Sequence, residues 1–211
     1  MRKIDLRKQL KPLYSAKPGI PALVEMPRLK CLMIEGQGHP EGNVQFQEAM
    51  QALFGLAYTL KFKSKLGPAK LDWTMMPPEG IWWARGDVPL EKADKADWRW
   101  ALLIVQPDAV TAPMVREAKA ALREKSNPPR LDDLRLASIR EGKSLQIMHI
   151  GPYSTEQDSL VKLHHFAAEN GYSIGGRHHE IYFSDPRRAK PEKMKTLLRL
   201  PVKRAAPVPR N

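Results

Sequence analysis

LQIMHIG at residues 145–151 repeats the pattern of KCLMIEG at residues 30–36. Each stretch is a short apolar run that ends in glycine, and such a run is typical of a buried strand that leads into a turn. The same order of elements follows each stretch: a helix, at about 43–63 and about 154–170, and then two further strands. A duplicated strand-helix-strand-strand module therefore organises the chain.

The ends of the two expected helices carry capping residues. Asn43 is suited to cap the first helix. Ser154 and Gln157 form a capping-box pattern at the start of the second, and Gly171 lies just past its end, as a C-cap glycine does. These residues predict where each helix begins and where the second one ends.

The remaining segments complete an α+β domain, an antiparallel sheet with helices on one face. Its open face, or the seam between the modules, is where we expect a ligand. The expected strands that follow the helices lie at 71–76 and 80–85 in the first module and at 178–184 and 196–202 in the second. The expected organisation is an N-terminal arm at 1–28 with a short helix at 5–14, a single domain at 29–203 and a flexible tail at 204–211. Within the domain, module one is 29–86, a linking strand and helix occupy 97–126, and module two is 134–203.

Composition narrows the class of protein. The formal charge is +12, from 35 basic and 23 acidic residues, which raises nucleic acid as a partner. The basic residues are scattered or gather at the two ends, so solvated tails explain them better, and we do not expect nucleic acid binding. No apolar run approaches the ~20 residues of a membrane span, and the charged start does not resemble a signal peptide. With the single cysteine, Cys31, expected to be a buried inert thiol, a cytoplasmic protein is predicted.

The histidines do not form a metal motif. They include the neighbouring pairs 164–165 and 178–179, and neighbours point in different directions on a helix and to opposite faces on a strand. No phosphate-binding glycine loop and no nucleophile elbow is present. We therefore expect neither a metal nor another cofactor.

The tryptophans are more informative. All five fall in one window, on three expected strands, at positions Trp73, Trp82, Trp83, Trp98 and Trp100. The last two share a strand face, and only one of Trp82 and Trp83 can join them. Two interpretations stay open: packing in the core, or walls of a pocket for a flat ligand.

A carboxylate lies in the late strand HHEIYF, residues 178–183. Alternation places His178, Glu180 and Tyr182 on one face and His179 on the other, where it interrupts an apolar row. Glu180 is either an exposed strand carboxylate or a partly buried acid, base or cation ligand.

Several stretches together resemble the GyrI-like small-molecule-binding family, over about residues 5–203. The most diagnostic is HHEIYFSDPRR at 178–188, and the others are KLDWT at 70–74, PEGIWW at 78–83 and HIGPY at 149–153. The resemblance implies a pseudo-twofold ligand cleft between the duplicated modules. Relatives in this family sense drugs or bind toxic compounds, and their central glutamate corresponds to Glu180. The stand-alone branch, which this chain resembles, includes proteins that hydrolyse cyclopropanoid genotoxins.

The resemblance implies roles for individual residues. Glu180 would orient or deprotonate a water that attacks the strained ring, and Tyr182 or Tyr153 would donate to the developing phenolate. The expected ligand is a small, planar and hydrophobic molecule, held by His178 and by the aromatic walls formed by Trp73, Trp82, Trp83, Trp98 and Trp100. The alternative is a non-catalytic module that binds, sequesters or senses many drugs, with a partner protein if it is a sensor.

Overall fold

The computed structural model describes residues 2–205 and divides into two compact units. The first comprises Met1–Lys11 and Leu29–Ile139, and the second comprises Pro12–Arg28 and Arg140–Asn211. Both combine an antiparallel sheet with helix, so the α+β class is confirmed. The tail expected at 204–211 lies, beyond residue 205, outside the described residues.

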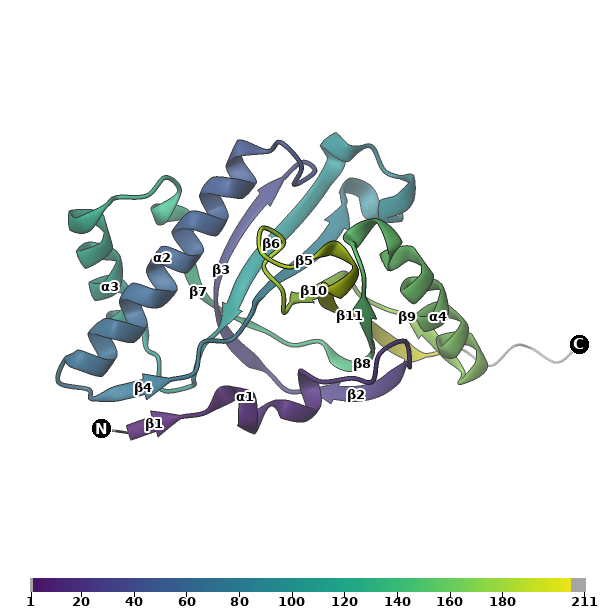
Figure 1. Cartoon of the computed structure of the whole chain (residues 1–211), viewed down its shortest axis with the longest axis horizontal. Helices are drawn as coiled ribbons and strands as arrows, with labels where there is room; N and C mark the ends of the chain where they lie inside the picture. The colour runs from purple at the N-terminus through teal and green to yellow at the C-terminus, as the bar shows by residue number, and fades with distance from the viewer. Residues whose placement is uncertain (1, 206–211) are drawn as a thin grey trace, which may run out of the picture. The chain divides into compact units, whose positions relative to one another are not determined.

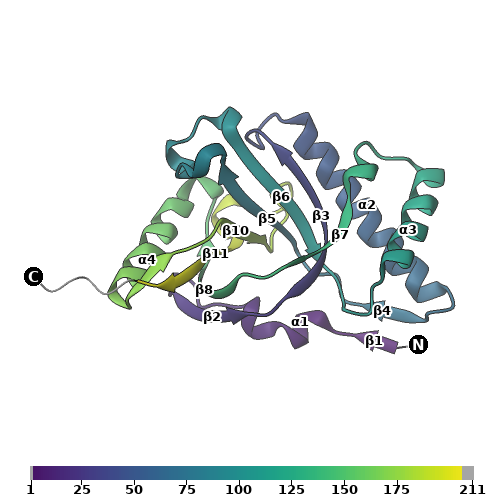
Figure 2. The same cartoon turned by 180° about the vertical axis from the view of Figure 1, so that it is seen from behind.

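The first unit is a four-stranded antiparallel sheet with two long helices. The strand order is β5-β6-β3-β7, and α2 packs on β3 and β6 with α3 beside it (Figure 1). Seen from behind, the same strands lie in front of α2 (Figure 2). Its elements are β1 (Arg2–Ile4), α1 (Leu6–Gln9), β3 (Leu29–Gln37), α2 (Val44–Leu66), β4 (Leu71–Trp73), β5 (Pro78–Ala84), β6 (Trp98–Val105), α3 (Ala112–Lys125) and β7 (Arg135–Ile139).

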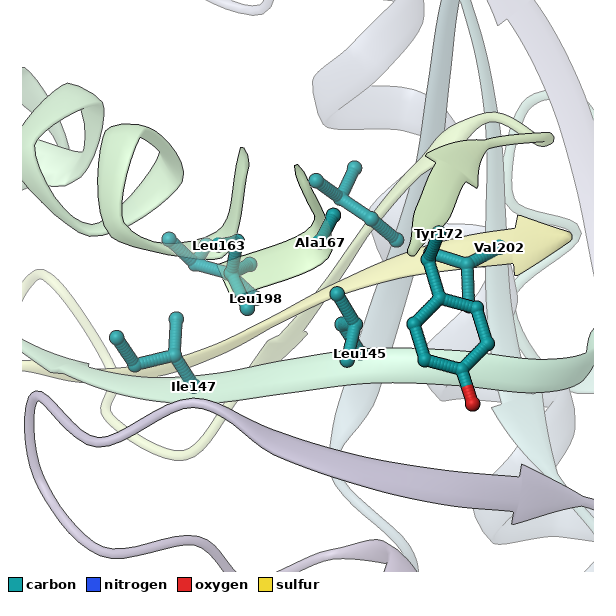
Figure 3. Close-up of a cluster of buried hydrophobic side chains, with 8 residues drawn as sticks. Leu145, Ile147, Leu163, Ala167, Tyr172, Leu198 and Val202 are labelled. Carbon is teal, nitrogen blue, oxygen red and sulfur yellow. The ribbon is translucent and has the colours of Figure 1, made fainter. Parts of the chain in front are cut away.

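The second unit repeats this plan with one long helix. The strand order is β10-β11-β8-β2, and β9 pairs with the end of β11. Its elements are β2 (Ala22–Met26), β8 (Gly142–Ile150), α4 (Glu156–Glu169), β9 (Tyr172–Ile174), β10 (His178–Tyr182) and β11 (Lys195–Arg204). Figure 3 shows its core, where Leu145 and Ile147 of β8, Leu198 of β11 and Leu163 of α4 pack together.

The internal repeat is present, but the strands that complete the first module differ from those that the sequence predicted. The strand expected to link the modules is β6, which pairs with both β3 and β5. It therefore corresponds to β11, which pairs with both β8 and β10. The short β4, expected to be one of the two module strands, pairs in parallel with β1 in a separate two-stranded sheet.

The segment expected to be an N-terminal arm contains β1, α1 and β2, which belong to the two units. Residues 2–11 belong to the first unit, and the segment from Pro12 to Arg28 belongs to the second, where β2 pairs with β8. The helix expected at 5–14 is a short α-helix, Leu6–Gln9, followed by a 3₁₀ turn, Lys11–Leu13.

Of the three predicted helix caps, two are confirmed: Asn43 at the start of α2, and Gly171, which lies just past the end of α4 with φ +69°. The side chain of Asn43 accepts a hydrogen bond from the backbone N–H of Phe46. The capping box at Ser154 and Gln157 is wrong, because α4 begins at Glu156 after a 3₁₀ turn. The hydroxyl of Thr155, which is the N-cap residue, donates to the carbonyl of Pro152 at 2.9 Å instead of capping the helix.

Cys31 is fully buried in β3, and burial is the main cause that raises the pKa of its thiol to about 12. An inert thiol is expected under these conditions. In the described residues, 2–205, no helix is long and apolar enough to cross a membrane.

Gly36 packs directly against the ring of Trp100. A Cβ atom at this position would lie 2.2 Å from ring carbons, closer than any real contact. We expect Gly36→Ala to destabilise the protein by about 1–3 kcal/mol, because the buried indole must shift. Urea unfolding measures this loss. The control is Gly175→Ala, whose Cβ would meet its nearest neighbours at 3.5 Å. An unchanged midpoint for Gly36→Ala would contradict the packing described.

Candidate functional site

Glu180 is held by two side chains of its own strand. Tyr182 donates a hydrogen bond to Oε2 at 2.7 Å, and Nε2 of His178 lies 2.7 Å from Oε1. The side chains of His178 and Glu180 are 13% and 15% exposed, so the pair is largely shielded from water while keeping access to it. Alternation in β10 places all three on one face, as predicted.

The register of β10 against β11 identifies that face. Glu180 pairs with Leu198 and Tyr182 pairs with Thr196. Directly opposed residues share a face in an antiparallel pair, and Leu198 belongs to the core that packs under α4. The carboxylate therefore lies on the side of the sheet that α4 covers.

Tyr153 joins these residues from the turn before α4. Its ring lies 6.0 Å from the ring of Tyr182 in an edge-to-face arrangement. Burial, followed by the charges of Glu156, Glu180 and Asp185, raises the pKa of Tyr153 to about 12. The phenol therefore keeps its proton at neutral pH and remains a hydrogen-bond donor.

Glu156 is a member of the site that the sequence did not predict. It is the first residue of α4 and is only 8% exposed. Burial, followed by the negative charge of Glu180, raises the pKa of Glu156 to about 9, although a hydrogen bond with the side chain of Thr196 lowers it. We define His178, Glu180, Tyr182, Tyr153 and Glu156 as the Glu180 cluster.

The protonation of Glu156 predicts how stability depends on pH. A folded-state pKa above the unfolded value means that the folded protein binds more protons between about pH 4.5 and pH 9, so this group lowers stability as pH rises through that window. One proton corresponds to a slope of at most about 1.4 kcal/mol per pH unit.

We expect Glu156→Gln to raise the melting temperature more at pH 8 than at pH 5. Thermal unfolding at both pH values measures the difference. Glu169→Gln is the control, because Glu169 is exposed at the other end of the same helix. An equal gain for the two variants at pH 8 would show that Glu156 is not held neutral.

Three of the five tryptophans are buried in the first unit. Trp82 stacks on Phe46 at 6.0 Å and meets Trp98 edge-on at 6.0 Å, and Trp100 meets Phe46 edge-on at 5.3 Å. Trp82 is thus the residue that joins Trp98 and Trp100 on one face. Trp73 and Trp100 are 1% and 0% exposed. These contacts favour core packing for Trp73, Trp82 and Trp100.

Trp98 and Trp83 keep some exposure. Trp98 is partly exposed and meets the ring of His39 edge-on at 4.9 Å. Trp83 points to the other sheet face, where it borders a hollow of about 360 Å³ with Arg99 and Glu35. These two residues remain the better candidates for ligand contact among the tryptophans.

A second hollow in the first unit has a different character. This groove of about 830 Å³ lies between α2 and α3, and its aromatic side chains, Phe54, Tyr58 and Phe62, stack along one side. The charged side chains that line it are Lys63, Glu117 and Lys125. In residues 2–205 no group of three or more histidine, cysteine or acidic side chains is arranged to hold a metal ion.

The family model for the GyrI-like small molecule binding domain matches residues 21–203. The chain belongs to this family. The chain is similar to an uncharacterized conserved protein from Listeria innocua, at 38% identity and a TM-score of 0.86, with 95% of this chain and all of that chain covered. A protein from the same organism described as a hydrolase is 36% identical with a TM-score of 0.83, again covering 95% of this chain and 100% of the other.

A more distant structure shares the GyrI-like fold alone. The C-terminal domain of EcmrR is 11% identical, with a TM-score of 0.54 over 88% of this chain and 98% of that domain. Among curated proteins no match was found. The family match therefore assigns this chain a small-molecule-binding domain, and the Listeria relative at 38% identity shares its fold.

Proposed function

We propose that this GyrI-like protein hydrolyses flat, strained electrophiles of the cyclopropanoid type, with Glu180 as the catalytic carboxylate. The observation that carries the proposal is the fixed geometry of Glu180, held between Tyr182 and His178 on a largely shielded strand. Listeria relatives described as hydrolases, at 36% and 37% identity, support an enzymatic role.

The reaction adds water to a spirocyclopropyl cyclohexadienone. A water oxygen forms a bond to a ring carbon while the strained carbon–carbon bond breaks, and its electron pair moves through the dienone to the carbonyl oxygen. Glu180 takes a proton from the attacking water, and the new phenolate takes up a proton to become a phenol. The sum is one water added, with no oxidant, reductant or further reactant.

The residues around Glu180 suit a reaction that needs a base for the water and a proton donor for the phenolate. Each oxygen of Glu180 holds one contact in the structure and has lone pairs left for a water. Release of ring strain supplies part of the driving force, so one well-placed base and one proton donor suffice. Such a protein would protect a bacterial cytoplasm from alkylating compounds.

The aromatic part of the site would bind the planar body of the ligand. Tyr153 and Tyr182 form an edge-to-face pair beside the carboxylate. Aromatic surfaces of this kind bind flat hydrophobic molecules without a charge requirement. A net charge of +12 also gives no long-range attraction to a cationic ligand, which favours a neutral substrate.

Mass spectrometry tests the proposed reaction. The wild type is incubated with a spirocyclopropyl dienone in heavy-oxygen water, with the compound in large excess over protein. We expect many turnovers to a phenol that carries the heavy oxygen on the opened side chain. Binding without any water addition would instead identify a sequestering or sensing module.

Single substitutions distinguish the contributions of the two tyrosine hydroxyl groups to turnover. Tyr182→Phe removes a hydrogen bond that fixes Glu180, and we expect turnover to fall by roughly 10-fold or more, from the loss of ~1.5–3 kcal/mol. Tyr153→Phe removes only a hydroxyl group near the site. Steady-state kinetics measure both, and full activity in both variants would remove the phenols from the mechanism.

A further inference from the structure

Glu156 has an oxygen without a partner. Its Oε1 atom is buried and makes no hydrogen bond to any residue of the described chain, 2–205. The residue as a whole is 8% exposed, and a hydrogen bond with the side chain of Thr196 engages the carboxyl group from β11. A buried polar atom without a partner costs ~1–3 kcal/mol, so such atoms call for an explanation.

The surroundings keep this carboxyl group neutral. Glu180 faces it from β10, Tyr153 faces it from the turn before α4, and the uncharged Thr196 of β11 hydrogen-bonds to it. His149 of β8 is engaged elsewhere, because its ring contacts the hydroxyl of Ser159 at 3.0 Å. The hydrogen bond with Thr196 favours the charged form of Glu156, but burial and the negative charge of Glu180 outweigh it and raise the pKa of Glu156.

The two carboxyl groups of the cluster thus have different surroundings. Glu180 accepts the hydrogen bond that Tyr182 donates, so the hydroxyl proton of Tyr182 is already engaged. The buried Oε1 atom of Glu156 has no hydrogen-bond partner in the described chain, so a proton on this oxygen is available to a ligand. Where two neighbouring carboxyl groups have surroundings as different as these, one is suited to act as the acid and the other as the base.

We propose that Glu156 donates a hydrogen bond to a carbonyl oxygen of the ligand, so that the site selects neutral planar compounds with a conjugated ketone. This inference rests on the proposed function and deepens it, since it assigns the proton that the dienone oxygen gains. In the reaction, the proton passes from Glu156 to the phenolate oxygen, and the proton that Glu180 took from water later restores the acid through solvent.

The binding test uses two unreactive analogues. One is a spirocyclopentyl dienone, which keeps the carbonyl but lacks ring strain, and the other is the same molecule with a methylene group in place of the carbonyl oxygen. Calorimetry at pH 7 gives the affinity of the wild type for each. We expect the ketone to bind about 10-fold more tightly, the value of one good hydrogen bond.

Substitutions and pH identify Glu156 as the donor. Glu156→Leu is expected to bind both analogues equally. Glu156→Gln keeps a donor that does not titrate, so it should retain the preference at every pH, whereas the wild type should lose it above about pH 9. Equal affinity of the wild type for both analogues, or a preference that survives in Glu156→Leu, would overturn the inference while leaving the ligand site intact. Failure of the wild type to bind either analogue would overturn the proposed function as well.

Discussion

Glu180→Gln is expected to lower turnover of a spirocyclopropyl dienone by about 10²–10⁴-fold, the usual contribution of a general base. The amide keeps the size of the side chain and still accepts the hydrogen bond from Tyr182, but it cannot take a proton from water. Affinity for the unreactive ketone analogue should change much less than turnover. Rapid-quench kinetics and calorimetry on the same preparation separate the two effects.

The matched control is Glu192→Gln, an exposed carboxylate in the 3₁₀ turn before β11. It should behave as the wild type does. If Glu180→Gln retains more than half of the wild-type rate, Glu180 is not the base. If it loses affinity and rate to the same extent, Glu180 acts in binding and not in proton transfer.

Arg199→Met is expected to destabilise the protein by about 3–5 kcal/mol, the cost of removing one partner from a buried charge network. Arg199 is fully buried and its guanidinium lies 3.4 Å from Glu141 and 3.2 Å from the side-chain oxygen of Gln146, and it donates to the carbonyl of Leu13 at 2.5 Å. Its loss leaves an acidic group with half of its partners.

The pKa of Glu141 explains the size of the stability loss expected for Arg199→Met. Burial alone raises its pKa, but the charges and hydrogen bonds of His179 and Arg199 outweigh burial and lower it. Adding Glu141→Gln to Arg199→Met should therefore recover part of the loss. Guanidinium unfolding of the single and double variants measures the coupling, and a loss below about 1 kcal/mol for Arg199→Met would contradict the network.

Much of the fold follows from periodicity. The repeat of strand, helix and strands was visible because each module begins with an apolar run that ends in glycine, at 30–36 and 145–151. The sequence did not predict that β6 pairs with β3 and β5, since strand pairing is a long-range contact. The stretch Trp98–Val105 has the pattern of a strand whichever strands it pairs with. Thus local pattern predicted the elements and left their partners open.

The face shared by His178, Glu180 and Tyr182 also follows from strand alternation. His179 interrupts the apolar row on the opposite face, yet it is fully buried there, with its Nδ1 atom 2.9 Å from an oxygen of Glu141. A signal for this network exists in the sequence: Arg199 interrupts the apolar strand TLLRLPV, and a buried arginine needs an acidic partner.

Glu156 could not be predicted from its position. An acidic residue in the first turn of a helix is usually an exposed group that interacts with the helix dipole. The groups that act on it, Glu180 of β10 and Thr196 of β11, come from distant parts of the sequence, so no local pattern encodes them. The tryptophans were easy to notice in the sequence, but their contacts favour a place in the core of the first unit over the walls of a pocket.

A crystal structure of the protein with the unreactive spirocyclopentyl dienone tests the central claim most directly. The account predicts the planar ligand against Tyr153 and Tyr182, with its carbonyl oxygen at hydrogen-bond distance from Glu156 and Glu180 beside the spiro carbon. A ligand seated in the groove between α2 and α3, with nothing near Glu180, would contradict it.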